Sequence, residues 1–517
     1  MAKRVFWAAA LGGALAVIGA SAGVAGGGPF PVSGPSNSIC TSAQDNSQPG
    51  RVFGNSTDEP NVAVFGSNAI AMWHQDRWSG GGAHGIGVGV SSNGGTTWTS
   101  SAMPWSVCEK GTPSSLTPYF RNSDPWVSFG PDGTAYASAL AFNILVPNWA
   151  NSVAVATSSD HGNTWNNVQP IPGSVFQLFS QGTDKNSTTA DPVHAGTAYT
   201  VWDTLFEPTD NPDDNPHTSS YTGPAFFSKT TDFGKTWSQA KVIVNTNQRQ
   251  QTIGNIILVD PRNDTLYDFT DLIVSPNTSL GQGTNANAQV AFVKSTDGGT
   301  TWTAPQVIAP FDSVGVFDPN TGAPLRVGNG LEEVAIDPSN GKLYVTWERS
   351  SNFAKNTKQS SVFWDDQIVL DTSSDGGATW SGPSVVHQLA SGMPSYTPQV
   401  AVNGNKVAIT YYDNRNLPAG DTANMPTDVW ASVSTNGGPF VEQHLAGPFD
   451  EMSAPVARGF FLGDYEGLVA SGSGFLAVFV TTNCTAPYTA PADCGPASSN
   501  RTPTSNVNPS SVFAATF

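Results

Sequence analysis

Charged side chains are scarce in this 517-residue chain: they make up 12% of it, and Lys and Arg together number only 22. The formal net charge of −18 argues against nucleic acid and anionic membrane surfaces as partners, since both repel an acidic protein. HExxH, CxxC and P-loop motifs are missing, as is a GxGxxG sequence between a strand and a helix. The sequence therefore lacks the usual signs of a zinc protease, a dithiol site or a nucleotide site.

Long apolar runs are also missing after the first 22 residues, so the remaining chain predicts no membrane span. The N-terminus has Lys3 and Arg4, an apolar run from Val5 to Ile18, and small residues at Ala20–Ala22. This is the pattern of a signal peptide with its cleavage site. We therefore expect residues 1–22 to be a signal peptide, residues 23–49 to be a flexible leader, and the protein to be secreted.

Glycine and proline are abundant instead, at 53 and 38 residues, which fits many short strands and turns. The chain also repeats the pattern S/T-x-D/N-x-G-x-T-W about every 60–80 residues, which is typical of a repeat architecture. Asp or Asn can accept backbone N–H bonds in a tight turn, Gly supplies a positive φ, and Trp supplies an apolar surface to bury. Five copies are complete and a sixth, Ser434–Phe440, is degenerate and one residue short; the complete copies are Ser91–Trp98, Ser158–Trp165, Thr230–Trp237, Ser295–Trp302 and Ser373–Trp380.

This pattern is the Asp-box, and through it the chain resembles the sialidase-like Asp-box (BNR repeat) β-propellers over nearly all of its mature length. In that family the box forms the hairpin between the third and fourth strands of each blade, on the face opposite the binding site. The resemblance implies a single all-β propeller domain over residues 50–517. It also implies that the boxes are structural.

A second repeat precedes each box: an acidic or polar residue, an apolar strand, a turn and another apolar strand. Seven such strand pairs can be distinguished, although only six carry a box; they start at Glu59, Asp124, Asp191, Gly254, Glu333, Pro398 and Gly463. A propeller closes its ring so that no sheet edge stays open. We therefore favour seven four-stranded blades, closed by Gly50–Phe53 beside the strand that ends at Phe517. Six blades, usual among sialidases, is the alternative.

Only four cysteines occur. In an exported chain four cysteines can form two disulfides, and three different pairings of the cysteines are possible. Cys484 and Cys494 lie in one Pro/Ala-rich loop, which favours a local bridge. The remaining pair, Cys40–Cys108, would connect the N-terminal segment to the end of the first repeat unit.

Propeller geometry brings the starts of the first strands and the ends of the second strands to one funnel. Carboxyl groups crowded in a shielded funnel should titrate apart, which gives an acid and a base. We expect a catalytic set at the strand starts, and this set consists of Glu332, Glu333, Asp464 and Tyr465. Asp124 and Asp191, which also open strands, are expected to bind substrate.

Three arginines, Arg77, Arg349 and Arg415, occupy equivalent positions after the second strands of units one, five and six. Guanidinium groups at equivalent places around a ring could clamp a carboxylate. Sialidases, which the chain resembles, hold their substrate's carboxylate with an arginine triad and use a Tyr/Glu pair as nucleophile. We expect these arginines to bind substrate; the alternative is that each braces a loop by pairing with a nearby carboxylate.

Together these features predict an exported, carbohydrate-active propeller that acts as an exo-acting, sialidase-like glycoside hydrolase. The alternative is a non-catalytic propeller that binds glycan or protein at the cell surface. We expect a glycan partner, a monomer, no required cofactor and no metal among the site residues. The acidic stretch Asp210–Asp214 could hold Ca²⁺ through oxygen ligands, or it is a solvated loop.

Overall fold

The computed structural model describes residues 27–109, 119–145, 149–178, 180–207, 221–274, 288–328, 331–353, 365–389, 392–483 and 510–517. Strands dominate these ranges, and the α-helix found within them is the single turn α1 (Ser42–Asp45). The all-β class predicted from the turn-rich composition is confirmed. Across the described ranges, no helix is long and apolar enough to cross a membrane.

The strands pair antiparallel in consecutive groups of four. Group 1 contains β2 (Val52–Phe65), β3 (Asn68–Trp78), β4 (Ala83–Ser91) and β5 (Thr99–Ala102), and group 2 contains β6 (Arg121–Phe129), β7 (Ala135–Asn143), β8 (Ala150–Ser158) and β9 (Asn166–Pro170). Group 3 contains β10 (Gln181–Ala190), β11 (Ala198–Phe206), β13 (Ala225–Thr230) and β14 (Lys241–Val244), and group 4 contains β15 (Gln250–Asp260), β16 (Thr265–Val274), β17 (Ala288–Ser295) and β18 (Gln306–Pro310). A short strand, β12 (Thr222–Gly223), pairs with β11 and β15.

The same order continues to the C-terminus. Group 5 contains β20 (Glu333–Ile336), β21 (Leu343–Ser350), β22 (Asp366–Ser373) and β23 (Ser384–Val385), and group 6 contains β24 (Ser395–Asn403), β25 (Lys406–Asp413), β26 (Pro426–Thr435) and β27 (Val441–Asp450). Group 7 joins β29 (Gly467–Ser471), β30 (Gly474–Thr482) and β31 (Ser510–Thr516) to β1 (Gly27–Pro31). The first and last described strands of the chain are therefore partners in one sheet.

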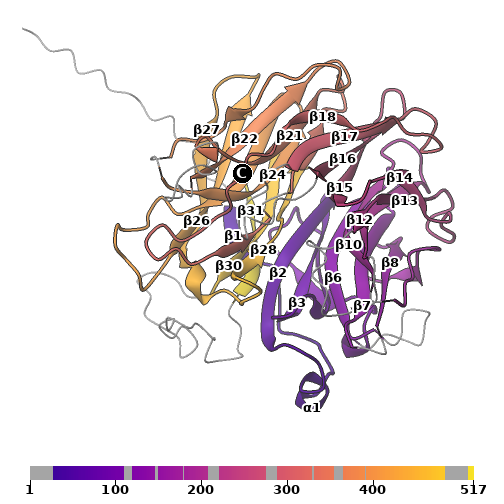
Figure 1. Ribbon diagram of the computed structural model, residues 1–517, viewed down its shortest axis with the longest axis horizontal. Helices are drawn as coiled ribbons and strands as arrows, with labels where there is room; N and C mark the ends of the chain where they lie inside the picture. Colours follow the sequence, from indigo (N-terminus) through magenta and orange to yellow (C-terminus); the bar gives the residue numbers. More distant parts are fainter. Residues whose placement is uncertain are drawn as a thin grey trace, which may run out of the picture.

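The first strands of successive groups lie side by side. β2 contacts β6, β6 contacts β10, and the series continues through β15, β20 and β24 to β29, which also contacts β2. Figure 1 shows the groups following one another around the molecule in chain order, from the indigo strands β2 and β3 to the orange and yellow strands β26–β30. Residues that open the first strands are thereby brought near one another from distant parts of the sequence.

The strand that pairs with β31 is not the one that the sequence predicted. β1 occupies this edge, with Gly27 opposite Thr516 and Pro31 opposite Phe513. The prediction for Gly50–Phe53 is wrong, because Val52 and Phe53 begin β2 and pair with β3. Residues 27–31 show no alternation of apolar and polar side chains, so the usual strand signal could not single them out. The segment predicted as a flexible leader thus supplies a strand where the structure describes it.

The predicted disulfide between Cys40 and Cys108 is confirmed. The backbone N–H of Ile39 also donates to the Cys108 carbonyl at 2.7 Å, so the segment before β2 is fastened to the end of group 1 by two kinds of bond. The predicted Cys484–Cys494 pair lies outside the described residues. So do the predicted signal peptide, residues 1–22, and the acidic stretch Asp210–Asp214.

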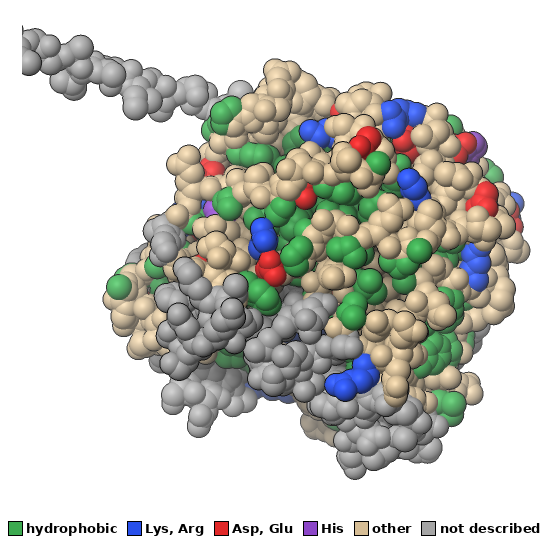
Figure 2. All heavy atoms as spheres, turned by 45° about the horizontal axis from the view of Figure 1, so that its top comes forward, with side chains coloured by type: hydrophobic (Ala, Val, Ile, Leu, Met, Phe, Trp, Pro, Cys, Tyr) green, Lys and Arg blue, Asp and Glu red, His purple; other side chains and the backbone are tan. Residues whose placement is uncertain are grey.

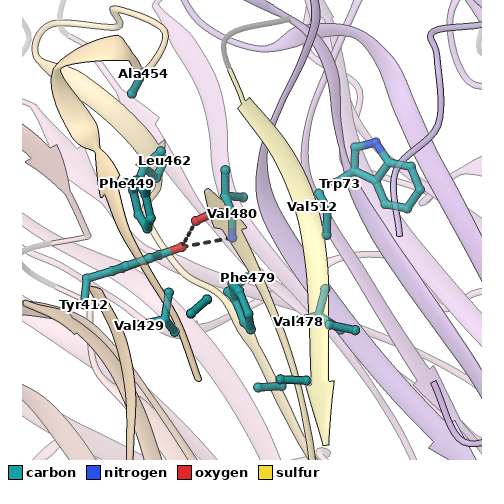
Figure 3. Close-up of a cluster of buried hydrophobic side chains, with 14 of the residues drawn as sticks. Trp73, Tyr412, Val429, Phe449, Ala454, Leu462, Val478, Phe479, Val480 and Val512 are labelled. Carbon is teal, nitrogen blue, oxygen red and sulfur yellow. Dashed lines mark hydrogen bonds between the residues drawn. The ribbon is translucent and has the colours of Figure 1, made fainter. Parts of the chain in front are cut away.

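The apolar core lies between neighbouring groups. Where groups 6, 7 and 1 meet, the buried side chains include Tyr412, Val480 and Trp73, and Figure 3 shows this cluster. The Tyr412 hydroxyl donates to the Val480 carbonyl at 2.7 Å and accepts from the Val480 N–H at 3.0 Å. β25 and β30 are thus joined by hydrogen bonds within an apolar contact, where the buried Tyr412 hydroxyl also contacts the Glu466 carboxyl group.

Each complete Asp-box joins the third and fourth strands of its group, as expected. In the copy between β17 and β18, Asp297 accepts from the Thr301 N–H at 2.8 Å and from the Thr301 hydroxyl at 2.6 Å. The Trp302 ring lies edge-on to Phe227 of group 3, with 5.5 Å between centroids. The repeat is therefore a hydrogen-bonded turn whose Trp packs on the preceding group.

Replacing a box tryptophan should destabilise the fold without changing the chemistry of any site at the other end of the strands. Trp237 is buried between groups 2 and 3, in a cluster with Val155 of β8. We expect Trp237→Ala to lower the free energy of unfolding by about 3–5 kcal/mol, measured by urea denaturation. Trp302→Ala is the matched comparison and should cost less, because Trp302 is only partly buried. Equal losses would contradict this account of box packing.

Candidate functional site

Away from the Asp-boxes, the first strands of groups 1, 2 and 3 each carry a β-bulge. The bulges contain Glu59, Asp124 and Lys185, whose φ angles are 51°, 53° and 42°. Residues with a side chain rarely adopt positive φ; each instance costs about 1–3 kcal/mol, and such residues concentrate at functional sites. A bulge also redirects a side chain. Three neighbouring strands therefore bring one charged residue each to a common point.

The Lys185 ammonium lies among three carboxyl groups at this point, and burial raises the pKa of one of them, Glu59, well above its ordinary value. Its Nζ is 2.7 Å from Asp464 Oδ2, 3.7 Å from Glu59 Oε1 and 3.8 Å from Asp124 Oδ2. Burial would lower the pKa of Lys185, but the surrounding carboxylates outweigh it and raise the pKa well above its ordinary value. Lys185 is therefore a fixed positive charge that joins groups 1, 2 and 3 to the segment before β29.

A parallel strand pair brings Arg326 and the Phe461 ring to this point, where Arg77 of β3 meets them. Asp464 follows β28 (Phe460–Gly463), whose partner β19 (Leu325–Val327) carries Arg326, and Arg326 Nη2 lies 3.0 Å from Asp464 Oδ2. The guanidinium groups of Arg77 and Arg326 lie 4.6 and 4.4 Å from the centre of the Phe461 ring. A cation is attracted to the ring face at such distances. Phe461 therefore helps to position both arginines.

Arg77, Lys185 and Arg326 border a cavity of about 240 Å³. Its lining contains four cationic side chains and two carboxylates, together with aromatic side chains and glycines; the charged members are Arg77, Lys185, Arg326, Arg458, Asp124 and Asp184. Phe142 and Trp149 supply aromatic surface. Figure 2 shows another view of the molecule, in which charged side chains are few and scattered. A cavity with this density of cations is therefore unusual for a chain so poor in Lys and Arg.

Asp124 and Asp184 share one hydrogen-bond donor. The backbone N–H of Lys185 donates to Asp124 Oδ2 at 3.1 Å and to Asp184 Oδ1 at 3.0 Å. Burial would raise the pKa of Asp124, but the Lys185 ammonium and His74 outweigh it and hold the pKa below its ordinary value. The Asp184 side chain is exposed to the cavity. Partial desolvation by the surrounding protein, and secondly the charge of Asp124, raise the pKa of Asp184 to about 6. The pKa values of two adjacent carboxyl groups are thus shifted in opposite directions.

His74 supports Asp124 from behind the cavity. Its Nε2 accepts from the Asp124 N–H at 2.9 Å, and its Nδ1 lies 2.5 Å from Asp58 Oδ1 and 3.1 Å from Arg77 Nη1. His74, Asp58 and Glu59 have ligand atoms close enough together for a metal ion. Both ring nitrogens are already engaged, however, and a guanidinium group occupies the same space. We therefore assign no metal to this cluster.

The predicted residues Glu332, Glu333 and Tyr465 line a separate hole of about 20 Å³, roughly the room of one water molecule. Burial raises the pKa of Glu332 well above its ordinary value and that of Glu333 to about 8. Neither oxygen of Glu332 has a hydrogen-bond partner among the described residues. Lys185 lines both this hole and the larger cavity, so these three residues are neighbours of the cavity and do not line it.

Two of the three predicted arginines lie elsewhere. Arg349 pairs with Asp312 at 3.0 Å, and Arg415 pairs with Asp413 and Glu442, both at 2.6 Å. Arg415 also lies over the Trp430 ring, 3.7 Å from its centre. Equivalent sequence positions therefore serve as loop braces here. The prediction of a common arginine rim needs correction: Arg77 does line the cavity, but its companions are Arg326 and Arg458.

Asp191 also lies away from the cavity. β10 ends at Ala190, and the Asp191 carboxylate accepts from the N–H groups of Val193 and His194, both at 2.8 Å. Asp191 therefore caps the turn after the first strand of group 3 instead of opening that strand. The sequence Asp191-Pro192 matches Asp124-Pro125. In the strand pairing, however, Lys185 occupies the bulge of β10 that corresponds to the bulge of β6 at Asp124.

Sequence reasoning missed Asp184, Lys185, Arg326 and Arg458. The segments that start at the bulges of β6 and β10 read Asp124-Pro-Trp-Val and Lys185-Asn-Ser-Thr, which share no residue type. Polar side chains dominate the start of β10, so its apolar periodicity begins too late to show where the strand starts. Arg326 lies in a three-residue strand, too short to leave a periodic signal. No local pattern could have identified these residues.

No protein-family model matches the sequence, and no curated protein matches it. Solved structures do match. A protein of unknown function from Dyadobacter fermentans is 12% identical, with TM-score 0.44, over 76% of this chain and 94% of that chain. The α-L-arabinanase of Penicillium chrysogenum is 13% identical, with TM-score 0.43, over 75% and 94%. A Hadza microbial sialidase is 14% identical, with TM-score 0.40, over 80% and 71%. Likeness this distant carries no argument about activity or substrate.

Proposed function

We propose that this chain is an exported β-propeller of seven blades that hydrolyses acidic glycans from their ends. The seven groups of four strands, the contacts that lead from β2 round to β29 and back to β2, and the pairing of β1 with β31 support a closed ring. The Cys40–Cys108 disulfide and the N-terminal signal-like sequence support export.

The pair Asp124 and Asp184 is the observation that carries the proposal. Glycoside hydrolysis uses one carboxylic acid to protonate the leaving oxygen and one carboxylate to attack the sugar or activate water. Asp184, with its pKa of about 6, serves as the acid, and Asp124, kept ionised, serves as the nucleophile or base. Because both oxygens lie within 3.1 Å of one nitrogen, they are closer than the roughly 6.5–9.5 Å of inverting enzymes. Double displacement with retention is therefore the favoured course.

The charge and size of the cavity indicate the substrate class. Lys185 and Arg326 are already paired with Asp464, whereas the exposed Arg458 has no ion pair among the described residues. Its guanidinium group could bind a sugar that carries a carboxylate through two hydrogen bonds. The cavity is smaller than the roughly 300–1,000 Å³ typical of drug-sized ligands, so it suits a single terminal sugar residue. Phe142 and Trp149 offer aromatic surface for the apolar face of such a ring.

A panel of aryl glycosides tests this proposal. We expect release of the aryl group from a sialoside or a glucuronide and little from neutral arabinosides or glucosides. On a natural glycoside, whose leaving oxygen must be protonated, kcat/KM should fall as the pH rises through about 6. Hydrolysis confined to neutral glycosides would refute the acidic substrate. No hydrolysis of any member, with sialic acid or glucuronic acid still bound, would favour the alternative of a non-catalytic glycan-binding propeller.

A further inference from the structure

The degenerate sixth repeat, Ser434–Phe440, is built differently from the five complete Asp-boxes. In each complete box the Ser or Thr oxygen at the first position accepts from the N–H of the glycine at the fifth position; these bonds join Gly95 to Ser91, Gly162 to Ser158, Gly234 to Thr230, Gly299 to Ser295 and Gly377 to Ser373. In the sixth repeat the Ser434 hydroxyl instead donates to the Gly438 carbonyl at 2.6 Å. The shorter sixth repeat therefore forms a turn with a different hydrogen bond from that of the complete boxes.

The fifth-position glycine of every complete box lies tightly against the preceding group. A Cβ on it would collide with a side chain of that group, as for Gly299 with Phe227 and Gly377 with Phe292. The equivalent Gly438 has no such neighbour, since a Cβ there would meet only the carbonyl of Thr435 in its own turn. The contact that fastens the other boxes is therefore absent between groups 5 and 6.

A cavity of about 310 Å³ lies where that contact would be. Leu370 and Thr372 of β22 form one wall, and Gly437, Gly438 and Phe440 of the short repeat form another. Five complete boxes fill the equivalent place with their own glycine and tryptophan. The sixth leaves it open, because it is one residue short and has Phe440 where the others have Trp.

The rest of the lining combines an aromatic ring with polar groups. Lys342 Nζ lies 5.1 Å from the centre of the Tyr344 ring, and Asp337 supplies one carboxylate. Asn405 Nδ2 donates to Asn436 Oδ1 at 2.8 Å, which leaves a carbonyl oxygen on Asn405 and N–H donors on Asn436 without another partner among the described residues. Adjacent amide donors and acceptors match the hydroxyl groups of a sugar, while aromatic and aliphatic surface matches its ring.

We propose that this cavity binds one neutral sugar residue of a glycan. One cation and one carboxylate balance in the lining, so neutral sugars suit it better than charged ones. An apolar peptide side chain would instead leave the side-chain amide groups of Asn405 and Asn436 unsatisfied once bound. The cavity lies at the Asp-box end of the strands, so this proposal does not depend on hydrolysis at the cavity around Lys185.

Restoring the box tests the inference. Grafting the eight-residue sequence of Ser295–Trp302 in place of Ser434–Phe440 should close the cavity. The probes are glucose, galactose, mannose, xylose, arabinose and N-acetylglucosamine, followed by saturation-transfer NMR. We expect at least one to bind the wild-type protein and the graft to weaken that binding by at least about tenfold. Asp184→Asn should bind it unchanged, because Asp184 lies in the other cavity.

Asn405→Ala gives a second test should the graft not fold. Asn405 is exposed and makes its side-chain bond only to Asn436 in the described part of the chain, so the variant should fold and bind the same sugar more weakly. Binding unchanged in the folded variants would overturn the proposal. The proposal would also be overturned if none of the six sugars binds. The same holds if a tryptophan-containing peptide binds at this cavity and no sugar does.

Discussion

Replacing Asp184 by asparagine is expected to lower kcat on a natural glycoside by about 10²–10⁴-fold. The amide cannot protonate the leaving oxygen, whereas the carboxyl, whose pKa is raised to about 6, can. Aryl glycosides with acidic phenols need little protonation, so their hydrolysis should fall much less. The loss of activity that accompanies ionisation of Asp184 near pH 6 should also disappear. Steady-state kinetics on both substrate types, over pH 4–8, measure these effects.

Asp124→Asn should behave differently, because an ionised carboxylate is needed whatever the leaving group. We expect both substrate types to lose activity to a similar extent. Asp191→Asn is the matched control: Asp191 resembles Asp124 in sequence but caps a turn away from the cavity, so kcat should stay near the wild-type value. Equal, small effects of all three changes would rule out the proposed acid and nucleophile.

Replacing Lys185 by methionine is expected to lower the free energy of unfolding by about 3–5 kcal/mol at pH 7, because buried Asp124 loses its cation and Asp464 keeps only Arg326. In the native protein the pKa values of Asp124 and Asp464 lie below their ordinary values, so their ion pairs stabilise the fold above about pH 4. This contribution is lost as the pH falls through the native pKa values. In the variant, burial should raise the pKa of Asp124, so the ionised carboxylate lowers the free energy of unfolding at neutral pH.

The sign of this effect provides its test. The difference in stability between the two proteins should be largest near pH 7 and shrink toward pH 4, where the carboxyl groups take up protons in the variant. Denaturation with urea at several pH values measures it. Lys235→Met, at an exposed position in an Asp-box, is the matched control and should change stability little at either pH. A loss for Lys185→Met that does not depend on pH would mean that packing, not charge, gives Lys185 its importance.

The local design of the fold could be predicted from the sequence. The Asp-box residues make their hydrogen bonds within eight consecutive positions, so the turn that Asp297, Gly299 and Thr301 form is specified wherever that pattern occurs. The spacing of the boxes, together with paired apolar runs, was enough to indicate repeated antiparallel strands. Cys40 and Cys108 could be matched only after Cys484 and Cys494 had been assigned to one loop. Such features depend on neighbours in the chain, which the sequence displays directly.

The central site depends on contacts that no local pattern records. Its charged residues come from groups 1, 2 and 3 and from the segments around Arg326 and Asp464, which are far apart in sequence and meet only when the first strands lie side by side. A bulge decides whether Asp124 or Lys185 points to that meeting place, and bulges are set by the pairing of two strands. Asp191 and Arg415 show the consequence. Each has the expected residue type at a matching sequence position, yet Asp191 caps a turn and Arg415 braces a loop. The sequence by itself determined the strands, the turns and the kinds of side chain available, whereas the tertiary structure decided which of them share a cavity, because burial and charge act through space.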